Sequence, residues 1–371
     1  MALNPKILAF YLPQFHETEY NSKWWGEGFT DWVSVKNAKP LYKGHNQPRI
    51  PENENYYDLS DENAIAMKYQ AKLAKDHGVY GFCIYHYWFA GAKYLDKPVD
   101  ILLKHPEIDI NFSLCWDSGS WKRNWYVNKF ESEILVQQDY GDKEMWRRHF
   151  NDLLPAFNDP RYIKIDNKPV FHIYKVNIIP CLKEMRDYFD LLARENGFDG
   201  IYLVVSDVEG REKLLDTVDA FYNYQPVYSY QTNARTLGVA LSYQFMKMKK
   251  WINQCFHTSF VPDKRSAKMM FKLMEKQDKY SVGKTYYGLL PDYDDTPRRQ
   301  RTGVVFNGNT PELFGYALNV LLRKSKAIGN EFLYITAWNE WSESAYLEPD
   351  TVNGMKYLEQ IKSLVEVNDG E

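Results

Sequence analysis

Short apolar runs alternate with helical segments along almost the whole chain, and this alternation limits the possible folds more than any other feature. Runs rich in β-branched and aromatic residues predict eight strands, which begin at Lys6, Val79, Asn111, Lys168, Ile201, Ala220, Thr285 and Glu331. Helical periodicity marks the segments between most of them, at 61–78, 142–157, 182–197 and 310–329. Because the runs are too apolar for a sheet with one wet face, the strands need cover on both sides. The sequence therefore predicts an α/β fold, a single closed (β/α)8 TIM barrel.

Two long segments exceed what a minimal barrel needs. Residues 15–60 are rich in Asn, Pro, Trp and Tyr and form an insertion after the first strand. Residues 227–284 form a basic, Met-rich helical insertion before the seventh strand, in which 246–251 is expected to be a solvated helix face. Without a Gly/Ser linker or an internal repeat, residues 1–371 are expected to form one catalytic domain.

Charge and composition exclude several classes of partner. The formal net charge of -3 provides no basic surface for nucleic acid or an anionic membrane. No apolar stretch approaches the roughly 18 residues of a membrane span. The N-terminal apolar run is not followed by a small-residue cleavage site, so we expect a cytoplasmic protein. The four cysteines lack metal spacing and are expected to be mostly buried thiols.

Aromatic residues and carboxylates gather where a barrel enzyme has its active site. The aromatic content of 16%, with 29 Tyr and 11 Trp, suits the stacking of sugar rings. The last predicted strand runs into TAWNEWSESAYLEPD at 336–350, which places Glu340 and Glu343 at the C-terminal end of the barrel. Paired carboxylates suit glycoside chemistry, although the same spacing also occurs in solvated pairs. Glu348 and Asp350 are expected to cap the next helix or face solvent.

The histidines do not form a recognisable metal site. His86 and His16 lie at predicted strand ends, where each suits a sugar hydroxyl, but a metal would need a third ligand at suitable spacing. His172 is expected to be a core histidine. We expect no metal and no other cofactor, because the sequence has no H-E-x-x-H, P-loop, G-x-G-x-x-G or G-x-S-x-G motif.

Several long motifs resemble one family. They are AFYLPQFH (9–16), NSKWWGEGFTDW (21–32), GFCIYHYWFAG (81–91), DPRYIKIDNKPVFHIY (159–174), DDTPRR (294–299) and AWNEWSESAYLEPD (337–350). The chain resembles the WbsX-like proteins of bacterial polysaccharide biosynthesis, which are similar to the endo-α-mannosidases and endo-α-mannanases of glycoside hydrolase family 99. The resemblance implies a retaining mechanism in which the residue matching Glu340 deprotonates the sugar 2-hydroxyl. Glu343 matches the general acid/base.

The same resemblance and the strand ends indicate which side chains bind the carbohydrate. The expected substrate-binding residues are Tyr11, His16, Trp25, Trp32, His86, Tyr87, Trp88, Trp116, Asp117, Trp121, Asp295, Arg298, Trp338, Asn339 and Trp341. WbsX-like proteins usually have Ala-Asn-Glu-Asn-Trp where this chain has residues 117–121, and Asp31 replaces a more usual Glu. Ser344 stands where the hydrolases have glycine. The sugar preference of the hydrolases is therefore not transferred.

Three functions remain open at this stage. The first is an endo-acting glycoside hydrolase or transglycosylase on a bacterial surface polysaccharide such as O-antigen, capsule or a mannan-like glycan. The second is a glycosyltransferase of lipopolysaccharide or O-antigen biosynthesis, with Asp292 and Asp294 as a metal-diphosphate motif. The third is an inactive carbohydrate-binding barrel. The sequence does not indicate the oligomeric state or the sugar.

Overall fold

The computed structural model describes residues 4–123, 133–206, 210–229, 248, 251–252, 255, 263–277 and 282–370. Parallel strands surround the core in the order β12-β10-β9-β8-β4-β2-β1-β15-β13. Their bounds are β1 Lys6–Tyr11, β2 Val79–Phe89, β4 Asn111–Trp116, β8 Lys168–Ile173, β9 Tyr202–Ser206, β10 Ala220–Tyr222, β12 Thr285–Tyr286, β13 Gly288–Leu289 and β15 Phe332–Ile335. All eight predicted strands are present, and the α/β barrel is confirmed.

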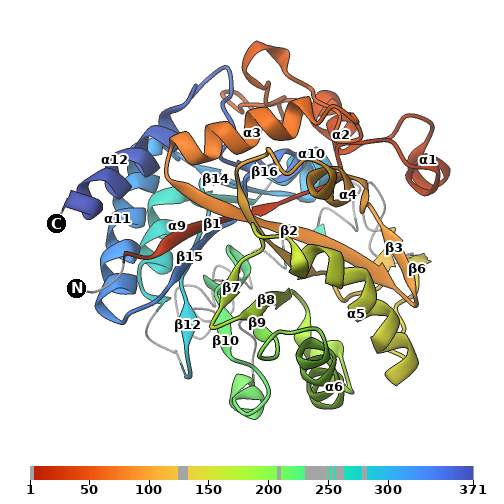
Figure 1. Ribbon diagram of the computed structural model, residues 1–371. Helices are drawn as coiled ribbons and strands as arrows, with labels where there is room; N and C mark the ends of the chain where they lie inside the picture. Colours follow the sequence, from red (N-terminus) through yellow and green to blue (C-terminus); the bar gives the residue numbers. More distant parts are fainter. Residues whose placement is uncertain are drawn as a thin grey trace.

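The predicted seventh strand consists of two short pieces, and it closes the barrel. Its first half, β12, pairs with β10, and its second half, β13, pairs with β15. The backbone amide of Tyr334 donates to the carbonyl of Tyr287, the residue between the two halves, over 2.9 Å. Strand β15 also pairs with β1, so the first and last strands of the barrel are neighbours (Figure 1).

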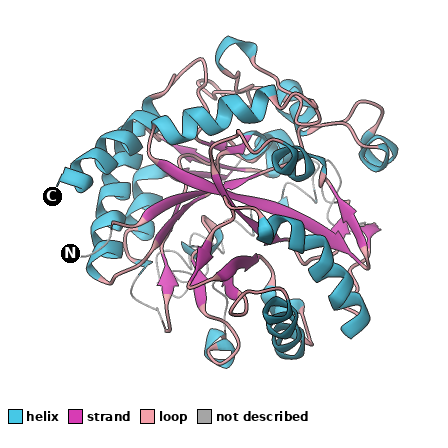
Figure 2. Cartoon of the chain, viewed as in Figure 1, coloured by secondary structure: helices cyan, strands magenta, loops and turns pink. Residues whose placement is uncertain are grey.

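Helices cover the outside of the sheet (Figure 2). The longer ones are α3 Ile65–Asp76, α4 Lys97–Lys104, α5 Lys143–Asn158, α6 Leu182–Glu195, α9 Ala267–Met274, α11 Pro311–Ala327 and α12 Lys356–Gly370. Between β9 and β10, the described residues contain the 3-10 turn η3 Arg211–Leu214 and no α-helix. Thr310 caps α11 by accepting from the amide of Leu313, and Gly329 follows that helix with φ +71°. This left-handed conformation explains the glycine there.

The 15–60 insertion contains α1 Glu19–Trp25, α2 Asp31–Asn37 and the 3-10 turn η1 Glu52–Glu54. Of the 227–284 insertion, β11 Asp263–Ser266 and α9 are described, and β11 pairs in parallel with β14 Val304–Asn307. Most of 246–251 lies outside the described residues. Smaller elements are β3 Ala92–Tyr94, β5 Trp121–Lys122, β6 Ile134–Val136, β7 Lys164–Ile165, η2 Val176–Ile178, α10 Thr296–Arg299, η5 Gln300–Thr302, β16 Asn339–Glu340, η6 Trp341–Glu343 and β17 Ala345–Tyr346.

Aromatic rings fill the interior of the barrel. The ring of Phe10 lies 5.3 Å from that of Tyr222 and 5.8 Å from that of Tyr334. His172 is a core histidine as predicted, because its Nε2 bonds to the Tyr334 hydroxyl at 2.8 Å and the residue is fully buried. Cys83 and Cys115 are buried thiols, whereas Cys181 is half-buried and Cys255 is exposed. In the described part of the chain, no helix is both long and apolar enough to span a membrane.

Candidate active site

A cavity of about 330 Å³ opens at the C-terminal ends of the strands, where barrel enzymes have their active sites. The strands and the loops that follow them contribute most of its wall, and the 15–60 insertion contributes the rest. Its lining is rich in aromatic and charged side chains and includes Gln14, Trp24, Trp25, Phe29, Tyr85, Tyr87, Asp117, Trp121, Tyr174, Lys175, Tyr224, Tyr293, Arg298, Glu340 and Glu343.

A tight turn after β15 brings Glu340 and Glu343 to this cavity. Glu340 ends β16, which pairs with β17, and Glu343 lies in the 3-10 turn between them. The turn ends at Ser344, whose φ of +52° is left-handed. Glycine adopts this conformation without strain, which is consistent with the glycine of the hydrolase motif that this segment resembles. The Ser344 hydroxyl accepts from Gln47 at 3.1 Å, which helps to hold the serine in the turn.

Arg298 of α10 connects the two glutamates to a third carboxylate. Its Nη1 lies 2.7 Å from Glu343 Oε1 and 3.5 Å from Glu340 Oε1, while its Nη2 lies 3.3 Å from Asp31 Oδ1. Asp31 also accepts from the hydroxyl of Ser342 at 2.9 Å. The short ion pair is thus made with Glu343, and Glu340 has only the longer contact.

Glu340 is poorly compensated for a buried carboxyl group. The residue is only 6% exposed, and its Oε2 has no hydrogen-bond partner among the residues that the structure describes. Burial, together with the charge of Glu343, raises the pKa of Glu340 to about 8. Such a perturbed carboxyl group in a cavity is typical of a catalytic residue.

Tyrosines surround Glu340. The hydroxyls of Tyr85 and Tyr224 lie 2.7 Å apart, and Gln14 donates its amide to the hydroxyl of Tyr87 at 3.3 Å. Burial raises the pKa of Tyr85 and of Tyr224 well above the usual range, and the charge of Glu340 acts in the same direction. Their hydroxyls therefore remain protonated and can donate hydrogen bonds to a bound ligand.

The segment that differs from WbsX-like proteins, 117–121, is built around Lys175. Lys175 Nζ donates to Asp117 Oδ1 at 2.8 Å, and the Ser118 hydroxyl donates to the Lys175 carbonyl at 2.8 Å. A Cβ on Gly119 would lie 2.8 Å from Lys175 Cδ and 2.9 Å from its Nζ, so glycine leaves the room that the lysine occupies. Trp121 adds an aromatic surface, with its ring 5.0 Å from that of Tyr87.

Of the residues expected from the sequence, seven line the cavity: Trp25, Tyr87, Asp117, Trp121, Arg298, Glu340 and Glu343. The other ten are buried and do not line the cavity, which corrects the prediction that they lie at its surface. They are Tyr11, His16, Trp32, His86, Trp88, Trp116, Asp295, Trp338, Asn339 and Trp341.

The alternation of side chains along β2 explains part of this correction. Tyr85 and Tyr87 point into the cavity, so His86 and Trp88 point outward to α5. There His86 Nε2 bonds to His149 Nε2 at 3.0 Å, and the Trp88 indole donates to Asp152.

The remaining buried residues have partners within the protein, with the exception of His16 Nδ1. Tyr11 donates to Gln70, the Trp32 indole donates to the Tyr57 carbonyl, and the Trp116 indole donates to the Trp88 carbonyl. Asp295 binds the amide of Val304 and the side chain of Arg299. Asn339 bonds to both the amide and the carbonyl of Leu12. Burial lowers the pKa of His16, whose Nδ1 has no hydrogen-bond partner.

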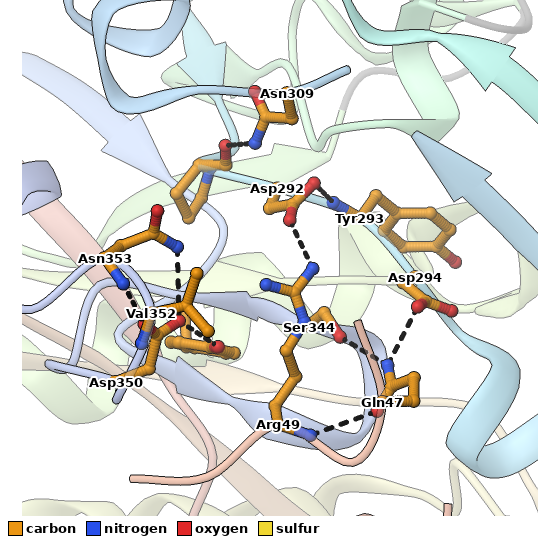
Figure 3. A network of polar contacts seen from close by, with 12 residues as sticks. Gln47, Arg49, Asp292, Tyr293, Asp294, Asn309, Ser344, Asp350, Val352 and Asn353 are labelled. Carbon is orange, nitrogen blue, oxygen red and sulfur yellow. Dashed lines mark hydrogen bonds and ion pairs between the residues drawn. The ribbon is translucent and has the colours of Figure 1, made fainter. Parts of the chain in front are cut away.

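Sequence reasoning missed several lining residues, above all Tyr174, Lys175 and Tyr224. Tyr174 follows β8 by one position and Tyr224 follows β10 by two, and the available signal was that both lie in the last part of a predicted strand run. It also misplaced Glu348 and Asp350, which are 7% and 3% exposed. Asp350 accepts from the Tyr346 hydroxyl and from the amide of Val352 (Figure 3).

The Asp292–Asp294 pair faces the 15–60 insertion (Figure 3). Asp292 binds Arg49 at 2.7 Å, and Asp294 Oδ2 lies 2.8 Å from both His45 Nε2 and Gln47 Nε2. Neither aspartate lines the cavity, whereas Tyr293 between them does. The two carboxylates thus hold the insertion against the end of the seventh strand.

Comparisons with known proteins agree with this architecture. The model of the family described as Glycosyltransferase WbsX matches residues 7–361. An uncharacterized protein WxcX of Xanthomonas campestris pv. campestris is 29% identical over 358 residues, which are 95% of this chain and 48% of that protein. The same protein from a second strain is 30% identical over an equal span. The chain therefore spans about half the length of these curated relatives.

Two solved structures show the same fold. The GH99 endo-alpha-mannosidase from Bacteroides thetaiotaomicron superimposes with a TM-score of 0.57 at 14% identity, covering 99% of this chain and 98% of that one. A structure described as a glycoside hydrolase-like protein gives a TM-score of 0.59 at 13% identity, covering 97% of this chain and 94% of that one.

Proposed function

We propose that this chain, which belongs to the family described as Glycosyltransferase WbsX, cleaves glycosidic bonds with retention of configuration. The released glycosyl group passes to water or to a sugar hydroxyl. The proposed substrate is an internal linkage of a bacterial surface polysaccharide. Glu340 acts as base toward the sugar 2-hydroxyl and Glu343 as general acid/base. The observation that supports this most is the buried, unpartnered Oε2 of Glu340 beside the Arg298–Glu343 ion pair.

In the proposed first step, the Glu340 carboxylate takes the proton of the 2-hydroxyl while that oxygen attacks the anomeric carbon of its own sugar. The glycosidic C–O bond breaks, and Glu343 protonates the departing oxygen. The product is a 1,2-anhydro sugar. In the second step Glu343 deprotonates water, or a sugar hydroxyl in a transfer, which opens the anhydro ring, and Glu340 returns its proton to the 2-oxygen.

This route needs an ionised Glu340 and a protonated Glu343. In the free protein, burial favours the neutral form of Glu340, and Arg298 makes its short ion pair with Glu343. A substrate whose 2-hydroxyl meets Glu340 Oε2 supplies the hydrogen bond that this oxygen lacks, and such a bond favours the charged form. The substrate itself therefore moves the pair toward the reactive protonation state.

The test is digestion of bacterial O-antigen and capsular polysaccharides and α-mannans, in chelator, with new reducing ends as the readout. Cleavage by the wild type and none by Glu340→Gln supports the proposal. Glu343→Gln should retain activity only on substrates whose leaving group needs no protonation. Equal cleavage by the wild type and Glu340→Gln would contradict the proposal. So would a wild type that cleaves none of these glycans.

The family description favours a second candidate, a glycosyltransferase that uses a nucleotide sugar. A metal-diphosphate motif at Asp292 and Asp294 would need both carboxylates free for the ion, but these bind Arg49, His45 and Gln47. Transfer from a nucleotide sugar that stops in chelator would support this candidate over the hydrolase.

A further inference from the structure

One buried carboxylate behind the cavity binds the segment that carries both glutamates. Glu348 Oε1 accepts from the Gln70 amide at 2.7 Å and from the Trp338 indole at 3.2 Å. Its Oε2 accepts from the Trp341 indole at 2.6 Å and from the Tyr57 hydroxyl at 2.9 Å. Charge-assisted hydrogen bonds such as these are stronger than bonds between neutral groups.

The four donors come from three parts of the chain and converge around the Asn339–Glu340 strand. Trp338 and Trp341 flank this strand on both sides. The Tyr57 hydroxyl, besides donating to Glu348, accepts from the Asn339 amide at 3.3 Å. Glu348 therefore fixes Trp338 and Trp341, on either side of Glu340 in the sequence. Through Tyr57 it also fixes Asn339.

The indoles have further packing that makes this fixation directional. The Trp341 ring stacks on Tyr346 with centroids 3.7 Å apart, and the Trp338 ring lies 5.1 Å from Phe82. An indole N–H donates but cannot accept, so only an acceptor at position 348 satisfies both tryptophans. Ring packing alone does not direct the two N–H groups to one point, and Glu348 does.

We propose that Glu348 is a positioning residue for the reaction: its carboxylate, through the two indoles and Tyr57, sets the place of Glu340 relative to Arg298 and Glu343. The kinetic part of this inference rests on the proposed function. Its geometric part concerns the 3.5 Å contact between Glu340 and Arg298 and does not depend on activity.

The test compares Glu348→Gln with Asp350→Asn at pH 8.5, above the pKa of Glu348, which burial raises to about 7. Each carboxylate oxygen of Glu348 accepts from one indole. In Glu348→Gln an NH2 group replaces one of these oxygens, so one of the two indoles loses its acceptor. Asp350 is the matched control, because it is a buried carboxylate in the same segment whose contacts with Tyr346, Val352 and Asn353 do not involve the catalytic pair.

Three measurements are made on both variants: kcat and KM separately, the indole ¹H–¹⁵N signals of Trp338 and Trp341, and crystal structures. We expect Glu348→Gln to lower kcat by about 100-fold, as misplacement of a reacting group by about 1 Å does, with KM near the wild-type value. Its indole signals and the Glu340–Arg298 distance should change. Asp350→Asn should leave kcat, the Trp338 indole signal and the Glu340–Arg298 distance unchanged; the Trp341 signal is not part of this control, because Asp350 binds Tyr346 and Tyr346 stacks on Trp341.

The two proposals fail in different ways. If Glu340 keeps its distance from Arg298 in Glu348→Gln, or if both variants lose kcat equally, the positioning role is overturned. If the wild type itself is inactive on every glycan while Glu340 moves in Glu348→Gln and not in the control, the positioning role stands and the proposed function fails.

Discussion

Replacing Glu340 by glutamine should inactivate the protein and, at the same time, make its fold more stable. Burial raises the pKa of Glu340 from its ordinary 4.5 to about 8, so the folded protein holds a proton that the unfolded chain releases. Between these two values, raising the pH favours the unfolded state. Stability is therefore lost as the pH rises from about 4.5 to about 8, and a neutral glutamine removes this loss.

The size of the effect follows from the same shift. One pKa unit corresponds to about 1.4 kcal/mol, so a shift to about 8 predicts a gain in unfolding free energy of about 1 kcal/mol at pH 5. The same calculation predicts about 3 kcal/mol at pH 7 and about 5 kcal/mol at pH 8.5.

Urea unfolding of the wild type and Glu340→Gln at pH 5, 7 and 8.5 measures these differences. Glu331→Gln is a useful control, because Lys284 and Tyr286 bind the Glu331 carboxylate and its pKa is lowered. This control should lose stability and show no gain as the pH rises. A gain for Glu340→Gln that is the same at all three pH values, or absent, would refute the reasoning that Glu340 is a buried, poorly compensated acid.

Three further predictions concern activity and the residues around the pair. Because the proposed reaction needs one proton on the Glu340–Glu343 pair, kcat/KM should fall above about pH 8, where Glu340 releases that proton, and a kcat/KM that stays level above this pH would contradict the mechanism. Gly119→Ala should push the Lys175 side chain away from Asp117 and raise KM several-fold, as should Lys175→Met; an unchanged KM in both would place the ion pair outside the substrate contact. Arg298→Lys should lower the unfolding free energy by about 3 kcal/mol, because one ammonium cannot replace a planar fork that contacts three carboxylates; denaturation equal to that of the wild type would show that the network contributes little.

The barrel and the place of Glu340 and Glu343 at the cavity were predictable because local signals determine them. A segment that directly follows the last strand of a barrel must lie at the C-terminal end of the barrel, whatever the rest of the chain does. Which alternate side chains of β2 point into the barrel was not predictable, since both faces of this strand are apolar and aromatic. Tyr85 and Tyr87 could not be distinguished from His86 and Trp88 by hydrophobicity, and only α5 packing decides which pair points inward.

Contacts between residues far apart in the sequence were also not predictable. Asp31 and Arg298 are 267 residues apart, and nothing in either motif indicates that they form an ion pair. The burial of Glu348 was not predicted, for a similar reason. Its position after a turn suggested solvent, but two of its four donors come from the 15–60 insertion and α3, whose placement over the site follows from the fold as a whole.

The pairing of β1 with β15 has a consequence for synthesis of the protein. Strand β1 is synthesised before its partner at 332–335, which follows more than 300 residues later. Until then β1 has an unpaired edge, and unpaired strand edges are prone to aggregation. Temporary cover of that edge, by a chaperone or by another part of the chain, would protect the nascent chain until β15 is made. Strand β15 leads directly into the turn that carries Glu340 and Glu343, so these two side chains reach the cavity only when the sheet loses its exposed edge.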